Sequence, residues 1–326
     1  MERIKIRKIY GLIALGAFLW LLPSVGLGQC NVSIGTTSYP NISTALYFAV
    51  PGNVINVSGT CTEIVTVLAN KAHITLNGGG TATLTCPSTG CPTGNVTILG
   101  QWITINGFNI TGGQWGIALS SGANATIDGN TISDHGSGIL VAYDSSAVIV
   151  NNTIHDNGVN PNLYKGGTVF CGIVVNDNSS ALIGFRSPLD TVASPNIIRN
   201  NPDGIILRGS ANARIVGNTI SNNTNNGIKL IRGSQAEISD NLIDGNGQNG
   251  IFVSQGSGVS LGNDPTGNTI FDLPNSGTNG NKGLSCSIGG YVDGVLGTLD
   301  GLHGALGISR GCFNSVTRRG RAYEED

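Results

Sequence analysis

The chain has 326 residues, including 50 glycines and 36 asparagines, and only 11% of its residues are charged. Soluble proteins usually contain about a quarter charged residues, so this chain cannot cover the surfaces of long helices, which excludes a helical bundle. Collagen is excluded because the glycines keep no three-residue period, and disorder is excluded by the 39% of hydrophobic residues. The composition predicts a β-rich chain with many turns.

Residues 1–28 have the organisation of a secretory signal peptide. The apolar run of 14 residues, Ile9–Leu22, is too short to span a bilayer and is followed by a small-residue site that ends at Gly28. Four basic residues precede the run, namely Arg3, Lys5, Arg7 and Lys8. We therefore expect a secreted, periplasmic or cell-surface protein that has no membrane span once the signal is removed.

Nucleic acid is excluded as a partner by the charge of the remaining chain. Without residues 1–28 the net charge is −5, and no basic patch can be recognised in the sequence.

Seven cysteines in an exported chain predict disulfides. Proximity along the chain favours three pairs and leaves Cys171 as a free thiol, unless one of these pairings is wrong. The pairs are Cys30–Cys61, Cys86–Cys91 and Cys286–Cys312.

A repeat of 22 or 23 residues runs through the middle of the chain, wherever nothing is inserted. Each repeat reads Gly-Ile-x-aliphatic, a turn, Ala-x-Ile, a tight turn, Asn-x-Ile and another turn. The Asn-x-Ile column consists of Ile110, Ile132, Ile154, Ile198, Ile220, Ile243 and Ile270. The asparagines at the tight turn are Asn130, Asn152, Asn218, Asn241 and Asn268, and their stacked amides can hydrogen-bond along the column.

Three short strands in each repeat predict one coil of a parallel β-helix, whose isoleucines stack inside because one coil cannot bury its apolar face alone. The fold class is therefore all-β, a solenoid of coils about 22 residues long with a short N-terminal capping helix. We expect an N-terminal cap over residues 29–53, the β-helix over 54–275, and a C-terminal cap with a flexible tail over 276–326.

The chain resembles the right-handed parallel β-helix repeat proteins of the pectate-lyase-like superfamily. Four stretches between residues 39 and 275 carry the likeness: Gly129–Asp134, Gly217–Asn222, Tyr39–Ala45 and Pro51–Val57. The resemblance implies a right-handed β-helix that begins with a short capping helix. It is unspecific for activity, because the superfamily includes lyases, hydrolases, epimerases and adhesins.

Two insertions interrupt the repeat in one central coil, and insertions in solenoids often form loops beside a binding groove. One lies between Ile154 and Ile173, and the other lies between Ile183 and Ile198. They place Tyr164, Lys165 and Arg186 among the candidates for substrate binding or catalysis.

The register also predicts a cluster of polar side chains next to the insertions. Asp134 and Asp156 follow equivalent strands about 4.8 Å apart, with His135 and His155 beside them. Two neighbouring carboxylates can divide into an acid and a base, or they can hold Ca²⁺, which prefers oxygen ligands. The alternative is a structural role, because Asp and Asn are ordinary turn residues.

Arg199 and Arg208 follow in the same coil and complete the set of candidates. Polysaccharide lyases of the superfamily use a basic side chain to remove the proton beside a uronate carboxylate, which Ca²⁺ or another cation neutralises. No role is carried over from the family to a particular residue here. Because they converge near the insertions, Asp134, Asp156, His155, Arg199 and Lys165 are candidate catalytic residues, and His135, Tyr164, Arg186 and Arg208 are candidate substrate-binding residues. No extended family motif is matched, so surface ion pairs are the alternative role for the arginines.

Three functions remain open at this point. The first is an exported β-helix that engages extracellular polysaccharide on a lateral groove without proven catalysis. The second is a lyase or epimerase acting on uronate-containing glycans. The third is a structural or adhesive protein that self-associates through a mostly apolar outer column, unless an inserted loop or the C-terminal cap covers that column. The column consists of Ala118, Leu140, Val174, Ile206, Lys229 and Phe252.

Overall fold

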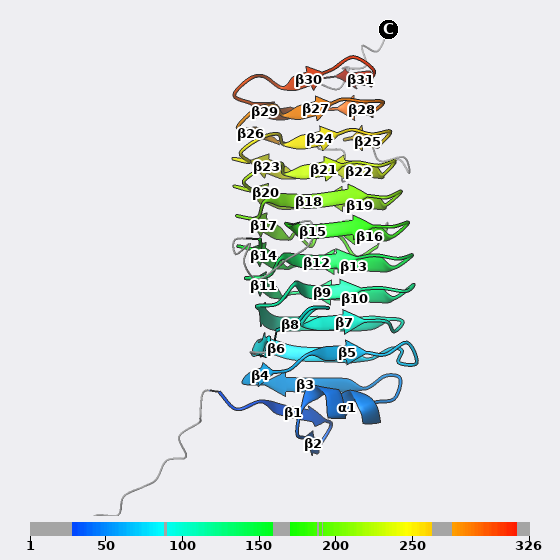
Figure 1. Ribbon diagram of the computed structural model, residues 1–326, viewed down its shortest axis with the longest axis vertical. Helices are drawn as coiled ribbons and strands as arrows, with labels where there is room; N and C mark the ends of the chain where they lie inside the picture. The colour runs from blue at the N-terminus through cyan, green and yellow to red at the C-terminus, as the bar shows by residue number, and fades with distance from the viewer. Residues whose placement is uncertain are drawn as a thin grey trace, which may run out of the picture.

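The structure is a computed structural model that describes residues 28–87, 90–158, 170–187, 189–190, 192–262 and 276–317. The expected signal peptide therefore lies, apart from Gly28, outside the described residues. The described part forms the predicted parallel β-helix, and Figure 1 shows its coils stacked along the long axis of the molecule. In that part of the chain, no helix has the length and apolar character that crossing a membrane requires.

Each coil contributes strands to three rows that run the length of the β-helix. The first row consists of β3 (Val54–Ser58), the first parts of β6 (Thr75–Thr85) and β8 (Ile103–Thr111), β10 (Asn124–Asp128), β13 (Ser146–Val150), β16 (Ser180–Ile183), β19 (Asn212–Val216), β22 (Gln235–Ser239), β25 (Gly258–Leu261), β28 (Tyr291–Val295) and β31 (Phe313–Thr317).

The second row is built from shorter strands that follow the first row after a tight corner. It consists of β4 (Thr60–Thr62), the last parts of β6 and β8, β11 (Thr131–Ser133), β14 (Thr153–His155), β17 (Ile197–Arg199), β20 (Thr219–Ser221), β23 (Leu242–Asp244), β26 (Ser276–Asn279) and β29 (Thr298–Gly301).

The third row forms a separate sheet. It consists of β5 (Val65–Val67), β7 (Val96–Ile98), β9 (Trp115–Leu119), β12 (Ser137–Val141), β15 (Cys171–Asn176), β18 (Asp203–Arg208), β21 (Ile228–Leu230), β24 (Ile251–Val253), β27 (Leu284–Cys286) and β30 (Leu306–Ile308).

The core is the stack of aliphatic side chains that the repeat predicts. Ile132, Ile154 and Ile198 pair with one another across successive coils, and each is fully buried. Full burial of an isoleucine stabilises a fold by about 1.5–3 kcal/mol, so stacking the coils supplies the stability that one coil lacks. Ile270 of the same predicted column lies outside the described residues.

The asparagines at the corner between the first and second rows form the predicted ladder. The side-chain amide of Asn152 donates to Oδ1 of Asn196 at 3.0 Å and to the carbonyl of Ile127 at 2.9 Å. Asn130, Asn218 and Asn241 make equivalent contacts, so the buried corner satisfies its own backbone groups. Asn196 takes this place after the second insertion and is absent from the predicted list of asparagines, although it begins the Asn-x-Ile motif of Ile198. Asn268 of that list lies outside the described residues.

The N-terminal cap closes the first coil as expected. It contains β1 (Asn31–Ile34), β2 (Thr37–Tyr39) and the helix α1 (Ile42–Phe48). Oδ1 of Asn41 accepts from the backbone N–H of Thr44 at 2.7 Å, and Glu63 accepts from the N–H of Ile42 at 2.8 Å. These two contacts satisfy backbone donors in the first turn of the helix, which fixes its position over the open end.

The C-terminal region differs from the expected boundary at residue 275. β26 pairs with β23 and β29, while β28 pairs with β25 and β31, all in parallel. Residues 276–317 therefore continue the β-helix by further coils rather than forming a separate cap. The repeat does not predict this continuation, because the many glycines of residues 276–317 weaken the alternation of apolar residues by which the other coils are recognised.

The three predicted disulfides are confirmed as Cys30–Cys61, Cys86–Cys91 and Cys286–Cys312. Cys171 is free and buried. Burial raises the pKa of the Cys171 thiol to about 12, so this cysteine behaves as a small apolar core residue.

Candidate functional site

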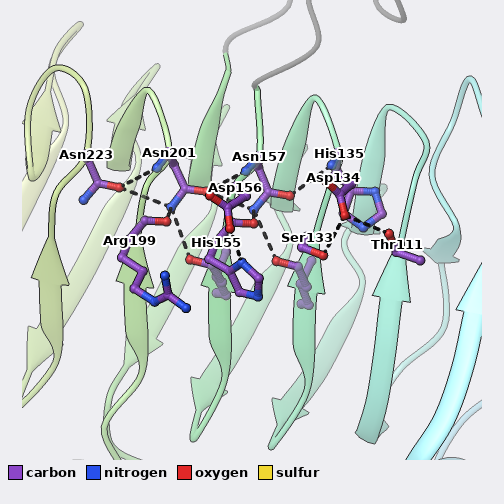
Figure 2. Close-up of polar contacts among 12 residues, drawn as sticks. Thr111, Ser133, Asp134, His135, His155, Asp156, Asn157, Arg199, Asn201 and Asn223 are labelled. Atoms are coloured by element: carbon purple, nitrogen blue, oxygen red, sulfur yellow. Dashed lines mark hydrogen bonds and ion pairs between the residues drawn. The ribbon is translucent and has the colours of Figure 1, made fainter.

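The candidate site lies where the second row ends and the chain turns toward the third row. Adjacent strands place Ser133, His155 and Arg199 side by side, because Ser133 pairs with His155 and His155 pairs with Arg199. Inward-facing isoleucines precede these residues, so the alternation of the strand turns all three side chains outward. The predicted column is therefore present in the structure (Figure 2).

The residue that follows each of these strands sits at the corner in a left-handed conformation. Asp134, Asp156, Asn200 and Asn222 have φ between 53° and 61° here. Asp and Asn adopt this conformation more readily than other non-glycine residues, which explains why they hold these four corners, while Gly112 and Gly245 hold the equivalent corners of other coils. Turn geometry therefore accounts for the presence of the aspartates, and only their side-chain contacts can indicate chemistry.

Asp156 has such a contact. Nδ1 of His155 lies 2.6 Å from Oδ2 of Asp156, and the Asp156 side chain is 43% exposed. The hydrogen bond from His155 lowers the pKa of Asp156, and Asn200 and the positive charge of Arg199 lower it further against the opposing effect of burial. Asp156 is therefore ionised at neutral pH and can only accept a proton from Nδ1.

This contact fixes the tautomer of His155. Because the Asp156 carboxylate has no proton to donate, the neutral form of the imidazole carries its hydrogen on Nδ1 and its lone pair on Nε2. The imidazole is only partly buried, with a side-chain exposure of 21%. The pair thus has the arrangement of a general base held in place by a carboxylate.

Arg199 supplies a positive charge on the next strand, beside His155 (Figure 2). Among the described residues, no carboxylate oxygen comes within 4.0 Å of its guanidinium nitrogens. A guanidinium that no carboxylate of the described residues pairs with, on a polar outer face, is suited to bind a carboxylate from outside, with two parallel hydrogen bonds.

Asp134 is held differently from Asp156. Its Oδ2 accepts from the hydroxyls of Thr111 at 3.2 Å and Ser133 at 3.1 Å. Thr111 lies on the coil before Asp134, whereas Asp156 binds His155 of its own coil (Figure 2). The two carboxylates therefore have separate partners.

Ca²⁺ would need several oxygen ligands around Asp134 and Asp156. Among the described residues, the cluster of three His, Cys, Asp or Glu ligand atoms that the geometry allows contains Cys30, Cys61 and Glu63, and two of these form a disulfide. No such cluster includes Asp134 or Asp156 in the described ranges. Binding of Ca²⁺ by Asp134 and Asp156 stays a prediction.

His135 is not a surface residue, which corrects its assignment to substrate binding. Only 1% of it is exposed, and its Nε2 donates to the carbonyl of Ile110 at 3.1 Å. Burial lowers the pKa of His135 from 6.5 to about 4, so it is neutral inside the fold. It takes a position that asparagine holds in the following coils.

This position belongs to a second ladder, at the corner between the second and third rows. Asn157 donates to the carbonyl of Ile132, and Asn201 donates to that of Ile154, as His135 does to Ile110. The ladder consists of His135, Asn157, Asn201, Asn223, Asn246 and Asn279. The Asn-x-Ile repeat does not predict this second ladder, although an Asn recurs three residues after the isoleucine of that motif.

The other candidates are dispersed. Arg186 binds Asp128 at 2.8 Å, at the corner before β17. Arg208 ends β18, a full strand beyond the corner that follows Arg199, and its Nε is buried without a partner. Tyr164 and Lys165 lie outside the described residues. The structure thus brings together His155, Asp156 and Arg199, with Asp134 on the neighbouring coil.

The apolar outer column of the third row is not an exposed surface in the central coils. Val174 and Ile206 are at most 2% exposed and form a small buried cluster with Cys171. Trp115 and Leu140 pack against this cluster. Burial removes this column as a surface for self-association in these coils, and it corrects that expectation.

Two solved structures are similar to this chain. The chain resembles an alginate lyase from Paenibacillus sp. strain FPU-7, with 18% identity, a TM-score of 0.39, and coverage of 84% of this chain and 95% of the lyase. It also resembles a double mutant of the periplasmic alginate epimerase AlgG, with 14% identity, a TM-score of 0.39, and coverage of 82% and 79%. A search of the curated proteins gives no match.

The family comparison covers most of the solenoid. A model of the family described as "Right handed beta helix region" matches residues 53–187 and 163–288, which together span more than half of the chain. This match adds the right-handed sense to the stacked parallel rows of the structure. The chain therefore belongs to the right-handed β-helix family.

Proposed function

We propose that the protein is an exported β-helix protein that engages uronate-containing polysaccharide on the outer face of its second row. The observation that carries this proposal is Arg199, a guanidinium without a carboxylate partner among the described residues, beside the His155–Asp156 pair. Disulfides at both ends of the β-helix support a location outside the cytoplasm.

A polyuronate chain suits this face because its shape and charge match. Neighbouring coils lie about 4.8 Å apart, which is close to the length of one pyranose unit in an extended chain. Arg199 can bind one sugar carboxylate through two parallel hydrogen bonds. Hydroxyl groups of Ser133 and Ser221, on the coils either side of His155 and Arg199, can bind the hydroxyls of neighbouring sugars.

The His155–Asp156 pair favours a second, catalytic form of this function. A carboxylate bound to Arg199 carries less negative charge, so the hydrogen on the adjacent C5 carbon becomes more acidic. Nε2 of His155 can take that proton while Asp156 stabilises the charged imidazolium through Nδ1. The electron pair then remains on the sugar, at C5.

Two outcomes follow from the same carbanion. In a lyase, the electron pair forms a C4–C5 double bond and the C4–O bond breaks, so the leaving oxygen takes a proton from water. In an epimerase, water returns a proton to C5 from the opposite face and no bond of the chain is broken. Both outcomes assign that proton to water.

Incubation with alginate, pectate and other polyuronates, with and without Ca²⁺, tests this function. A lyase creates unsaturated ends that absorb ultraviolet light, whereas an epimerase changes the ratio of sugar signals in NMR spectra. Binding without either change supports the non-catalytic form. Absence of binding to all polyuronates would reject the proposal and favour a structural or adhesive role.

A further inference from the structure

A groove of about 600 Å³ runs along the outer face of the first row, away from the His155–Arg199 face. Its floor is made by two columns of outward side chains. The second outward residues of successive strands are Val148, Leu182, Arg214, Glu237 and Ser260. The first outward residues are short or polar. Ser146, Ser180, Asn212 and Gln235 belong to this column, which Asn124 extends toward the N-terminal end.

Large aromatic residues stand at both ends of the same column. Trp102 directly precedes Ile103, which pairs with Ala125, so Trp102 lies level with Asn124. At the other end Tyr291 pairs with Gly258 and lines the groove. Trp102 is 60% exposed and Tyr291 is 47% exposed. Tyr291 therefore lines the groove at one end, while Trp102 stands one coil beyond Asn124, the lining residue at the other end.

The ring of Trp102 is held in place on the surface. It stacks on His73 with 6.0 Å between the ring centroids and 12° between the planes. Both residues have positive φ, at 56° for Trp102 and 53° for His73, a conformation that costs of the order of 1–3 kcal/mol for such side chains. Burial does not offset this cost, because most of the Trp102 side chain faces solvent.

The charges in the groove cancel. Nε of Arg214 lies 3.3 Å from Oε2 of Glu237, and the Arg214 guanidinium also stacks over the ring of Phe185 at 5.1 Å. This arginine is therefore engaged on two sides, unlike Arg199. A ligand for the groove should carry hydroxyl groups but no charge.

The dimensions suit a linear chain of sugars. From β8 to β28 the column makes seven steps of about 4.8 Å, so Trp102 and Tyr291 lie roughly 34 Å apart. Each strand from β10 to β22 offers a hydroxyl or an amide at nearly the spacing of successive sugars, and only Gly258 of β25 leaves a step without one before Tyr291. Aromatic rings pack against the apolar faces of pyranose rings, while polar side chains bind their hydroxyls.

We propose that this groove is a second glycan-binding site that takes a neutral linear polysaccharide, with Trp102 and Tyr291 as stacking platforms at its ends. The site does not depend on Arg199 and can hold a different polymer from the acidic one. The protein would then connect two kinds of polysaccharide through two faces of one rigid solenoid.

Titration calorimetry with neutral hexasaccharides tests the proposal, with cellohexaose, mannohexaose and xylohexaose as probes. We expect at least one to bind, and we expect Trp102→Ala and Ser180→Tyr each to weaken that binding by about tenfold or more. Trp102→Phe should keep most of the affinity because it keeps a ring. Tyr47→Ala is a matched control, since Tyr47 is 76% exposed but lies in α1, off the column.

Circular dichroism and a melting curve show whether each variant is folded, and light scattering gives its oligomeric state. Failure of all three sugars to bind would overturn the proposal, as would unchanged affinity in both Trp102→Ala and Ser180→Tyr. A dimer that Ser180→Tyr dissociates, without sugar binding, would identify the groove as a contact between copies and also overturn it. Arg199→Ala separates the two sites, because it should leave neutral-sugar binding unchanged.

Discussion

Nδ1 of His155 lies 2.6 Å from Oδ2 of Asp156, and this contact leaves Nε2 of the imidazole as the basic atom. The two residues are neighbours in the chain, at the end of β14 and in the left-handed corner that follows it. The corner conformation turns the carboxylate back toward the imidazole. The left-handed corner at Asp156, which the chain needs in order to turn, therefore also orients the imidazole of His155.

Asp156→Asn tests the role of this contact in catalysis. An amide cannot stabilise the imidazolium, so turnover of a polyuronate should fall by roughly 10²–10⁴, the usual contribution of a general base. Measured rates of double-bond formation or of epimerisation report the change. Asp134→Asn is the control at the equivalent corner and should retain activity, and equal losses in both variants would contradict this role.

Acid should destabilise the fold through His135. Its pKa is near 6.5 in the unfolded chain and about 4 in the fold, so the unfolded chain binds the proton first as the pH falls. Stability is therefore full above about pH 6.5, falls between 6.5 and 4, and loses roughly 3 kcal/mol in total.

His135→Asn should remove this acid sensitivity. Asparagine holds the same ladder position in the following coils, where its amide donates to the matching isoleucine carbonyl. Urea unfolding at pH 7 and pH 4.5 measures the free energy of unfolding of both proteins. A variant that loses as much stability as the native protein between these pH values would show that another group is responsible.

Asn218 should contribute to stability far more than a surface asparagine. Its amide donates to the carbonyl of Ile183 at 3.0 Å, and its Oδ1 accepts from the backbone N–H of Asn196 at 3.0 Å. Asn218→Ala leaves these buried groups unpaired and should cost roughly 2–4 kcal/mol of unfolding free energy. Asn212→Ala, at an exposed position of β19, should change it by less than about 0.5 kcal/mol. Similar losses in the two variants would argue against the ladder.

The disulfide Cys286–Cys312 should stabilise the last coils. It joins β27 to the residue before β31 across a sequence separation of 26, and a closed loop of this length stabilises by about 3.5 kcal/mol in the chain-entropy model. The double variant Cys286→Ala with Cys312→Ala should show faster hydrogen exchange in β27–β31 and unchanged exchange in β11–β14. Uniform exchange rates across both regions would contradict a local role.

The sequence predicts the coil well because the positions at which aliphatic residues recur are the positions that the fold buries. Ile132, Ile154 and Ile198 recur at fixed places, and only an inward stack explains an aliphatic residue at each of them. The end of the β-helix was predicted too early because coils such as 276–301 contain glycine where others contain aliphatic residues. Periodicity weakens there, although the backbone pairing continues.

The site was harder to predict because register gives the column but not the direction of each side chain. Asp134 and Asp156 occupy equivalent corners, yet one binds Thr111 on the coil before it and the other binds His155 of its own coil. His135 follows Asp134 directly and is nevertheless buried, because the corner turns it into the ladder. The local backbone conformation at each corner sets the direction of these side chains, and a repeat pattern does not specify that conformation.

Substitution of Arg199 tests most directly whether the second row binds uronate polysaccharide. Calorimetry with an alginate hexasaccharide should show binding to the native protein and at least about tenfold weaker binding to Arg199→Ala. Arg186→Ala is the control, since Arg186 pairs with Asp128 at the corner before β17. We predict that only Arg199→Ala loses affinity for the hexasaccharide. Equal affinity of Arg199→Ala and the native protein would contradict binding of uronate at the second row.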